Sequence, residues 1–247
     1  MRAPYLVFIV LAACSKPGPA AEQPKSPCRA QTFEGSQFTV CNPGKGRIEL
    51  AAAGPKEQPI RRLADVETSL GQRAGDVAFA MNAGMYDEDG RPIGLAIVEG
   101  SQKHAINRRK GRGNFHLMPN GVFQVRQDGQ AEIVTSDKWK PSPKIRLATQ
   151  SGPMLVIDGK LHPAFEPDGS SRYVRNGVGI APNSLPLFVI SEDAVSLGKF
   201  GRFFRDELKA RNALFLDGAV SALWDPANGR RDVTKPLGPM VIAYKPR

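Results

Sequence analysis

The sequence predicts an α+β fold, in which a single domain is built on a mixed, mainly antiparallel β-sheet with a few packed helices. Short apolar runs bounded by turn residues far outnumber helical patterns along the chain. The 25 glycines and 21 prolines mark many turns between those runs. At 247 residues the chain is long enough to bury a sizeable core. It has no apolar stretch of about 18 residues, the length that indicates a membrane-spanning helix.

Alternation of apolar and polar residues, with turn residues between the runs, predicts the strands. In the N-terminal half we expect two strands within 37–50, one over 77–81, a hairpin of 94–98 with 103–106, and a meander of 115–118, 122–125 and 131–135. In the C-terminal half we expect strands over 145–149, 154–157, 173–180, 187–190, 214–216 and 240–244.

Two stretches have helical spacing. Pro59 stands at the first turn of a predicted helix over 59–70, where its missing N–H leaves no bond unmade. A second helix follows Ser196, which is a suitable N-cap. The apolar face of this helix consists of Leu197, Phe200, Phe203, Phe204 and Leu208. Aromatic residues at this spacing indicate core packing.

The first 27 residues are typical of a secreted lipoprotein. Residues 1–13 have the basic start and short apolar run of a signal peptide, and Leu11-Ala12-Ala13-Cys14 looks like a bacterial lipobox. We expect lipidation of Cys14, a flexible tether over 14–27 and a folded domain over 28–247. Ser15 after the cysteine favours the outer membrane, with the domain facing the periplasm. A plain signal peptide that is cut elsewhere is the alternative.

Two further cysteines, Cys28 and Cys41, lie close together in the sequence. In an oxidising compartment they would pair, and a disulfide that closes a loop of roughly 15 residues stabilises a fold by about 3 kcal/mol. Free thiols of an intracellular protein are the alternative, against which the lipobox argues.

The net charge of +10 indicates an anionic partner. Because the chain carries a secretory address, anionic carbohydrates, sugar phosphates or lipid head groups fit better than nucleic acid. The densest basic cluster is Arg108-Arg109-Lys110 with Arg112, set between glycines. A solvated loop is an equally good interpretation of that cluster.

An acidic residue follows the apolar run 214–216 directly: Asp217 precedes Gly218, and the hydroxyl of Ser221 comes shortly after. A strand that ends in this way presents its acid at a sheet edge, where ligands usually bind. In the same way, the strand over 77–81 delivers Asn82 to a sheet edge. A simple Asp-Gly turn is the alternative for Asp217.

Four stretches, taken in order and spacing, resemble the phosphodiester glycosidase family over roughly residues 38–244. They are Asn82-Ala83-Gly84-Met85-Tyr86, Gln150-Ser151-Gly152-Pro153-Met154-Leu155, Arg175-Asn176-Gly177-Val178-Gly179-Ile180 and Leu216-Asp217-Gly218-Ala219-Val220-Ser221. Residues 114–123 also look like a stretch of small bacterial members. The family usually has glycines where Ala219 and Val220 stand, and an aromatic residue where Met85 stands.

The residues suggest how a sugar 1-phosphodiester would be cleaved. Its leaving group is a phosphate monoester, which is stable without protonation, so one carboxylate and one cation are enough. Asp217 would act as base or nucleophile, Arg175 would hold phosphate with its planar fork, and Asn82 would orient the sugar or water. The other expected substrate-binding residues are Gln150, Ser151, Gly152, Asn176, Gly218, Ser221 and His116. No cofactor is expected, and no residue spacing predicts a metal site.

Two alternatives remain open at this point. One is a catalytically silent envelope protein that binds polysaccharide or peptidoglycan. The other is a glycosidase of ordinary glycosidic bonds, which would need a second acid about 5–10 Å from Asp217. Glu166, Asp168 and Asp87 are the candidates for that acid.

Overall fold

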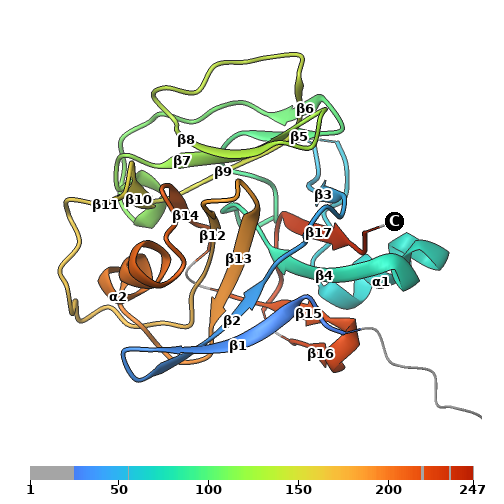
Figure 1. Ribbon diagram of the computed structural model, residues 1–247. Coiled ribbons are helices and arrows are strands. Elements are labelled where there is room, and N and C mark those ends of the chain that lie inside the picture. Colours follow the sequence, from blue (N-terminus) through green and yellow to red (C-terminus); the bar gives the residue numbers. More distant parts are fainter. Residues whose placement is uncertain (1–24, 55, 218–219, 234, 247) are drawn as a thin grey trace, which may run out of the picture.

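The computed structural model describes residues 25–54, 56–217, 220–233 and 235–246. Within these residues the strands form three sheets of antiparallel neighbours, which pack around one core (Figure 1). Residues 1–24, with the expected signal peptide and Cys14, lie outside the described residues, as do Gly218 and Ala219. Among the described helices none is long and apolar enough to cross a membrane.

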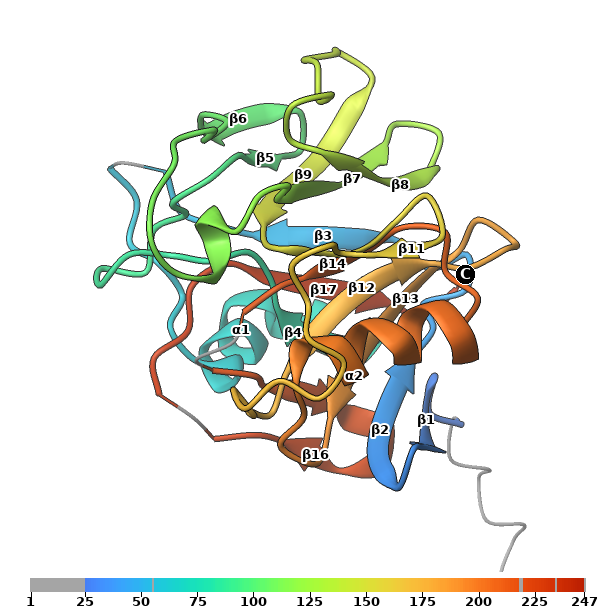
Figure 2. The same cartoon turned by 90° about the vertical axis from the view of Figure 1, so that its left-hand side faces the viewer.

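The largest sheet has seven strands in the order β1-β2-β13-β12-β14-β10-β11 among the described residues. Helix α2, Leu197–Arg202, continues as a π-helical turn over Phe203–Glu207 and covers one face of this sheet (Figure 2). The ring of Phe203 stacks on Phe38 of β2 with centroids 4.0 Å apart. The strands are β1 Cys28–Phe33, β2 Ser36–Cys41, β10 Met154–Ile157, β11 Lys160–Leu161, β12 Asn176–Ile180, β13 Pro186–Ser191 and β14 Ala213–Phe215.

The second sheet has the strand order β16-β15-β4-β17-β3. Strand β4 is buried along its whole length, because it lies between β15 and β17 and carries the apolar run that the sequence predicts. Helix α1, Leu63–Leu70, packs Leu63 and Val66 against this sheet and leads into a 3₁₀ turn over Gly71–Asp76. The strands are β3 Ile48–Ala51, β4 Val77–Asn82, β15 Leu223–Asp225, β16 Arg230–Arg231 and β17 Met240–Tyr244, and a 3₁₀ turn covers Pro226–Asn228.

The third sheet has the order β6-β5-β9-β7-β8. Its strands are β5 Ala96–Val98, β6 Ser101–His104, β7 Gly121–Arg126, β8 Ala131–Thr135 and β9 Ile145–Ser151, with a 3₁₀ turn over Asn114–His116 before β7. Phe188 of β13 lies 5.5 Å, between ring centroids, from both Phe79 of β4 and Phe123 of β7. One ring from each sheet therefore meets in a common core, and the predicted single α+β domain is confirmed.

Several sequence expectations need correction. Residues 115–118 were expected to form a strand, but Phe115 is buried within a 3₁₀ turn, and β9 takes the place of this segment beside β7. The first helix starts at Leu63, because Arg62 before it is still extended. Strands β1, β11, β15 and β16 are additional to the expected ones. Ser196 does cap α2, and its Oγ accepts a hydrogen bond from Lys199 N at 3.1 Å.

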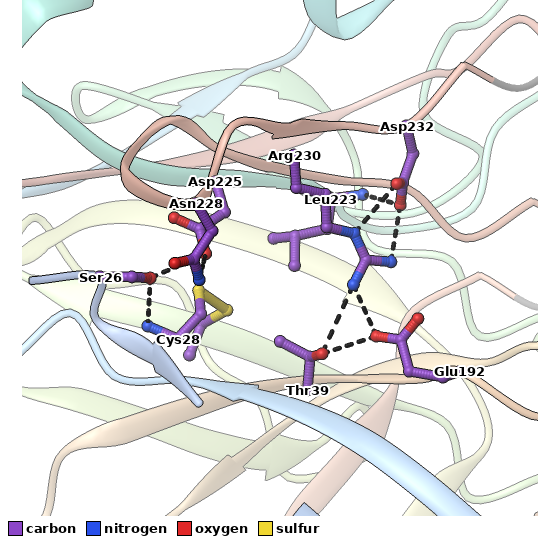
Figure 3. Close-up of a disulfide and its surroundings, with 10 residues drawn as sticks. Ser26, Cys28, Thr39, Glu192, Leu223, Asp225, Asn228, Arg230 and Asp232 are labelled. Atoms are coloured by element: carbon purple, nitrogen blue, oxygen red, sulfur yellow. Dashed lines mark hydrogen bonds and ion pairs between the residues drawn. A yellow bond between two sulfur atoms is a disulfide. The ribbon is translucent and has the colours of Figure 1, made fainter. Parts of the chain in front are cut away.

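The expected disulfide between Cys28 and Cys41 is confirmed (Figure 3). The two cysteines face each other at one end of the β1–β2 pair. Beside them, the hydroxyl of Ser26 donates to Asp225 Oδ2 at 2.7 Å and accepts a hydrogen bond from Cys28 N. The start of the folded domain is thus fixed to the end of β15.

Candidate active site

Two buried asparagines connect the seven-stranded sheet with the sheet of β4. Asn82 ends β4 and Asn176 begins β12. The side-chain amide of Asn176 donates to Asn82 O at 2.7 Å and to Asn82 Oδ1 at 3.1 Å. Asn82 in turn donates to Val220 O at 2.7 Å and accepts from Ala222 N at 2.9 Å. Asn82 therefore holds the backbone of Val220 and Ala222, shortly after Asp217, and Asn176 holds Asn82.

Asp217 lies just beyond β14, and its residue is 6% exposed. Its backbone N–H donates to Asn176 Oδ1 at 3.1 Å, which places the residue directly over the asparagine pair. The hydroxyl of Ser151 donates to the carbonyl of Leu216, the residue before. Ser221 Oγ lies 3.2 Å from Val174 O. Three predicted site residues, Asn176, Ser151 and Ser221, each from a different motif, therefore contact Asp217 or Leu216.

The side chain of Tyr86 lies close to Asp217, whose negative charge acts on the phenol. Burial, and next that charge, raise the pKa of Tyr86 to about 12. The phenol is therefore protonated at neutral pH. Its hydroxyl donates to Pro236 O at 3.0 Å. The guanidinium of Arg61 lies 5.8 Å from the centroid of the tyrosine ring.

Tyr86 was not among the expected site residues, although it ends the first of the four motifs. The signal that could have identified it is its place four residues after Asn82, at the end of the same buried strand and turn. Only the fold shows that the turn with Tyr86 lies close to Asp217, the acid of the last motif.

Arg175 is fully buried, with 0% exposure, just before β12. Its Nε donates to Val195 O at 2.7 Å and its Nη2 donates to Ser171 O at 2.8 Å. Nη1 is buried and has no hydrogen-bond partner among the described residues. Burial lowers the pKa of Arg175 to about 10, so the side chain remains a cation at neutral pH. One edge of the guanidinium is thus occupied by backbone carbonyls, and Nη1 is the group left for an anion.

Gln150 and His116 lie around a neighbouring loop. The Gln150 amide accepts from Leu95 N and Asn107 N, both at 2.9 Å, and donates to Asn107 O at 2.6 Å. His116 Nδ1 lies 2.8 Å from Arg109 O, so this nitrogen is the one that donates. These contacts fix residues 105–109.

Gly152 lies where the chain packs most closely against that region. A Cβ at this position would lie 2.5 Å from Asn120 Cβ, so a larger residue would force the two segments apart. Asn120 itself donates to Phe115 O at 2.9 Å. Gly152 therefore allows close packing behind the site. Gly218, another expected substrate-binding residue, lies outside the described residues.

The candidates for a second acid have other contacts. Asp168 lies 3.5 Å from Arg202 in an exposed ion pair, and Asp87 Oδ1 accepts a hydrogen bond from Arg91 N at 2.8 Å. Among the described residues, no group of three or more His, Cys, Asp or Glu side chains is placed to hold a metal ion.

Comparisons with known proteins agree with this arrangement. A family model for phosphodiester glycosidases matches residues 75–238. The uncharacterized protein YigE of Escherichia coli is 40% identical over 162 residues, which are 66% of this chain and 61% of that protein. The chain thus spans about three-fifths of the length of this curated relative.

Two solved structures share the fold. The catalytic domain of zebrafish N-acetylglucosamine-1-phosphodiester α-N-acetylglucosaminidase, auto-inhibited by its pro-peptide, is similar with a TM-score of 0.60 and 15% identity, over 89% of this chain and 82% of that one. A hypothetical protein from Synechocystis has a TM-score of 0.57 and 15% identity, over 87% of this chain and 61% of that one. At such identities the likeness is one of fold.

The sheet arrangement and the buried acid fit a hydrolase of the glycosidase type. The chain belongs to the phosphodiester glycosidase family, because the family model matches most of it. The resemblance in the four motifs is therefore confirmed, and membership supports a glycosidase-type function.

Proposed function

We propose that this protein hydrolyses sugar 1-phosphodiesters or a related glycan linkage, with Asp217 as base or nucleophile. The observation that carries the proposal is the environment of Asp217: a buried acid after a strand, positioned by Asn176 through its backbone, with the phenol of Tyr86 close by. A carboxylate that is fixed through its backbone and largely shielded from water is suited to act at an anomeric carbon.

In the proposed reaction the bond between the anomeric carbon and the phosphate oxygen breaks, and the electron pair leaves with the phosphate monoester. As base, Asp217 takes one proton from water, and the hydroxide adds to the anomeric carbon. As nucleophile, it bonds to that carbon first. Water then attacks the same carbon and loses one proton to solvent, and the bond to Asp217 breaks, which releases the sugar and returns the carboxylate. Arg175 Nη1 offers a positive charge to a phosphate oxygen, since its other edge is already bound to Val195 O and Ser171 O.

The test is the release of N-acetylglucosamine from a sugar 1-phosphodiester by wild type and by Asp217→Asn. The substitution keeps size and removes the charge, so kcat should fall by about 10²–10⁴ with little change in KM. The far-ultraviolet circular dichroism of both proteins should be the same. A folded Asp217→Asn variant with wild-type turnover would refute the role of Asp217. A wild type that binds the glycan without any turnover would instead favour a silent binding protein.

The protein's place in the cell is part of the proposal. We propose a lipid anchor at Cys14, with the domain facing the periplasm, most simply from the outer membrane. The lipobox-like sequence supports this, and the Cys28–Cys41 disulfide supports an oxidising compartment. Mass spectrometry of the membrane fraction should find a lipidated Cys14 as the first residue. An unmodified N-terminus at another residue would refute the anchor.

A further inference from the structure

A polar cleft of about 450 Å³ lies beside the candidate active site. One wall is the turn that follows Tyr86, including Asp87 and Pro92. The other wall is the segment after β6, which ends in Arg108 and Arg109. The basic cluster that the sequence singles out therefore borders a cleft, and the proposed chemistry at Asp217 does not use it.

The cleft is connected to the site through its walls. Tyr86, whose side chain lies close to Asp217, forms an isolated antiparallel bridge with Pro92. On the other wall, Asn107 donates to Ile93 O at 2.8 Å, which joins the two walls. The buried Gln150 holds the backbone of Asn107 from below. The cleft therefore begins at the turn directly after Tyr86, and its two walls are bonded to each other.

The arginines of the cleft differ in what they already bind. Arg108 is fixed, because its Nε donates to Ser136 O at 2.8 Å and its Nη2 to Trp139 O at 2.9 Å. The backbone of Arg109 is held by His116, but its exposed side chain has no hydrogen bond or ion pair within the described part of the chain. Arg175, by contrast, is fully buried. Arg109 is thus an accessible cation on a braced loop, and its charge is not neutralised.

We propose that this cleft is a subsite for a phosphate ester on the bound glycan, with Arg109 as the main contact and Arg108 beside it. The inference rests on the proposed function in one respect: the glycan in the cleft is the substrate that reaches Asp217. A guanidinium without a partner matches two phosphate oxygens, and its rigid backbone limits the entropy lost on binding. Asp87 is the acidic residue that lines the cleft, and its negative charge repels a bound anion.

The experiment is a nuclear magnetic resonance titration with N-acetylglucosamine 6-phosphate and, separately, with neutral N-acetylglucosamine. The phosphate ester has a free anomeric hydroxyl and cannot be cleaved, so binding is measured without turnover. Arg109→Gln should weaken binding of the phosphate ester about tenfold and leave the neutral sugar unchanged, since a hydrogen bond to a charged group is lost. Asp87→Asn should strengthen binding severalfold, because it removes the opposing charge.

Arg29→Gln is the matched control. Arg29 is an exposed arginine on β1 whose side chain, like that of Arg109, has no hydrogen bond or ion pair within the described residues. The Arg29→Gln substitution should leave the binding of both sugars unchanged. Equal weakening by Arg29→Gln and Arg109→Gln, or wild-type binding no tighter for the phosphate ester than for the neutral sugar, would overturn the subsite. Loss of binding in Arg109→Gln, in a protein that cleaves no phosphodiester, would support the subsite and refute the proposed activity instead.

Discussion

The side chain of Asn176 bonds both to the backbone carbonyl and to the side-chain oxygen of Asn82, at 2.7 and 3.1 Å. These two residues come from different sheets and are both buried. This contact joins the end of β4 to the start of β12. Asp217 is held beside the joined ends by the bond from its N–H to Asn176 Oδ1. The position of the acid thus depends on a polar contact between sheets as well as on its own strand.

Asn176→Ala should lower both stability and turnover. It leaves Asn82 O and the N–H of Asp217 without their partner, and a buried polar group without a hydrogen bond costs about 1–3 kcal/mol. We therefore expect a lower free energy of unfolding in urea and a reduced kcat. Asn183→Ala is the control: it removes only an exposed bond from Leu185 N at 3.2 Å, so it should lower stability much less and leave kcat unchanged. Equal stability of the two variants would show that the contact between the asparagines contributes nothing measurable.

Tyr86→Phe removes the hydroxyl that lies close to the Asp217 carboxylate and leaves the ring that packs against Gly238. If the phenol turns to donate to the carboxylate during turnover, the lost hydrogen bond to a charged group costs about 1.5–3 kcal/mol, so kcat should fall by roughly 10- to 100-fold. KM should change little, because the phenol acts on the acid and is not expected to hold the sugar. Steady-state kinetics on the phosphodiester checks this. Unchanged kcat in the folded variant would remove Tyr86 from the site.

Arg175→Lys keeps a cation but loses the planar group that bonds to Val195 O and Ser171 O. The free energy of unfolding should fall in any case, because the buried carbonyl of Val195 and the more exposed carbonyl of Ser171 lose a donor. If the side chain also binds phosphate, KM should rise more for a sugar 1-phosphodiester than for the neutral nitrophenyl glycoside. An equal rise for both substrates would leave Arg175 with a structural role only.

His162 should make the protein less stable in mild acid. The ring is buried, donates from Nε2 to Met118 O at 3.0 Å and accepts from Ala164 N at 3.2 Å through Nδ1. Burial lowers the pKa of His162, although the bond to Met118 acts in the opposite direction. As the pH falls through about 6.5, the unfolded chain takes up a proton that the folded chain refuses, so the free energy of unfolding decreases.

Urea denaturation of wild type at pH 8 and pH 5 measures this loss. His162→Asn, which keeps a donor near Met118 O but does not titrate in this range, should show a smaller difference between the two pH values. The same difference in wild type and variant would assign the acid sensitivity to other groups.

Removal of the disulfide should cost stability without changing the site. The bridge closes a separation of 13 residues, for which a loss of about 3 kcal/mol is expected in Cys28→Ala/Cys41→Ala. Unfolding in urea, with and without dithiothreitol, should show that reductant affects wild type and leaves the double variant unchanged. Labelling of the denatured, unreduced wild type should modify neither cysteine, and full labelling of both would contradict the pairing.

The sequence by itself determined the features that depend on local pattern. Apolar runs bounded by turn residues gave most strands, and two of those runs end beside Asn82 and Asp217, which lie at the ends of β4 and β14. The pairing of Cys28 with Cys41 also followed from closeness along the chain. Such signals are local, because strand periodicity and turn chemistry act over a few residues.

Only the tertiary structure decided which residues lie opposite these strand ends. The contact of Tyr86 with Asp217, the burial of Arg175 and the place of β9 beside β7 depend on residues far apart in the chain. A sequence pattern shows that a side chain is polar and near a turn, but not which other turn lies opposite. The physical reason is that packing three sheets around one core fixes those neighbours, and the short-range preferences of the chain are compatible with many such packings.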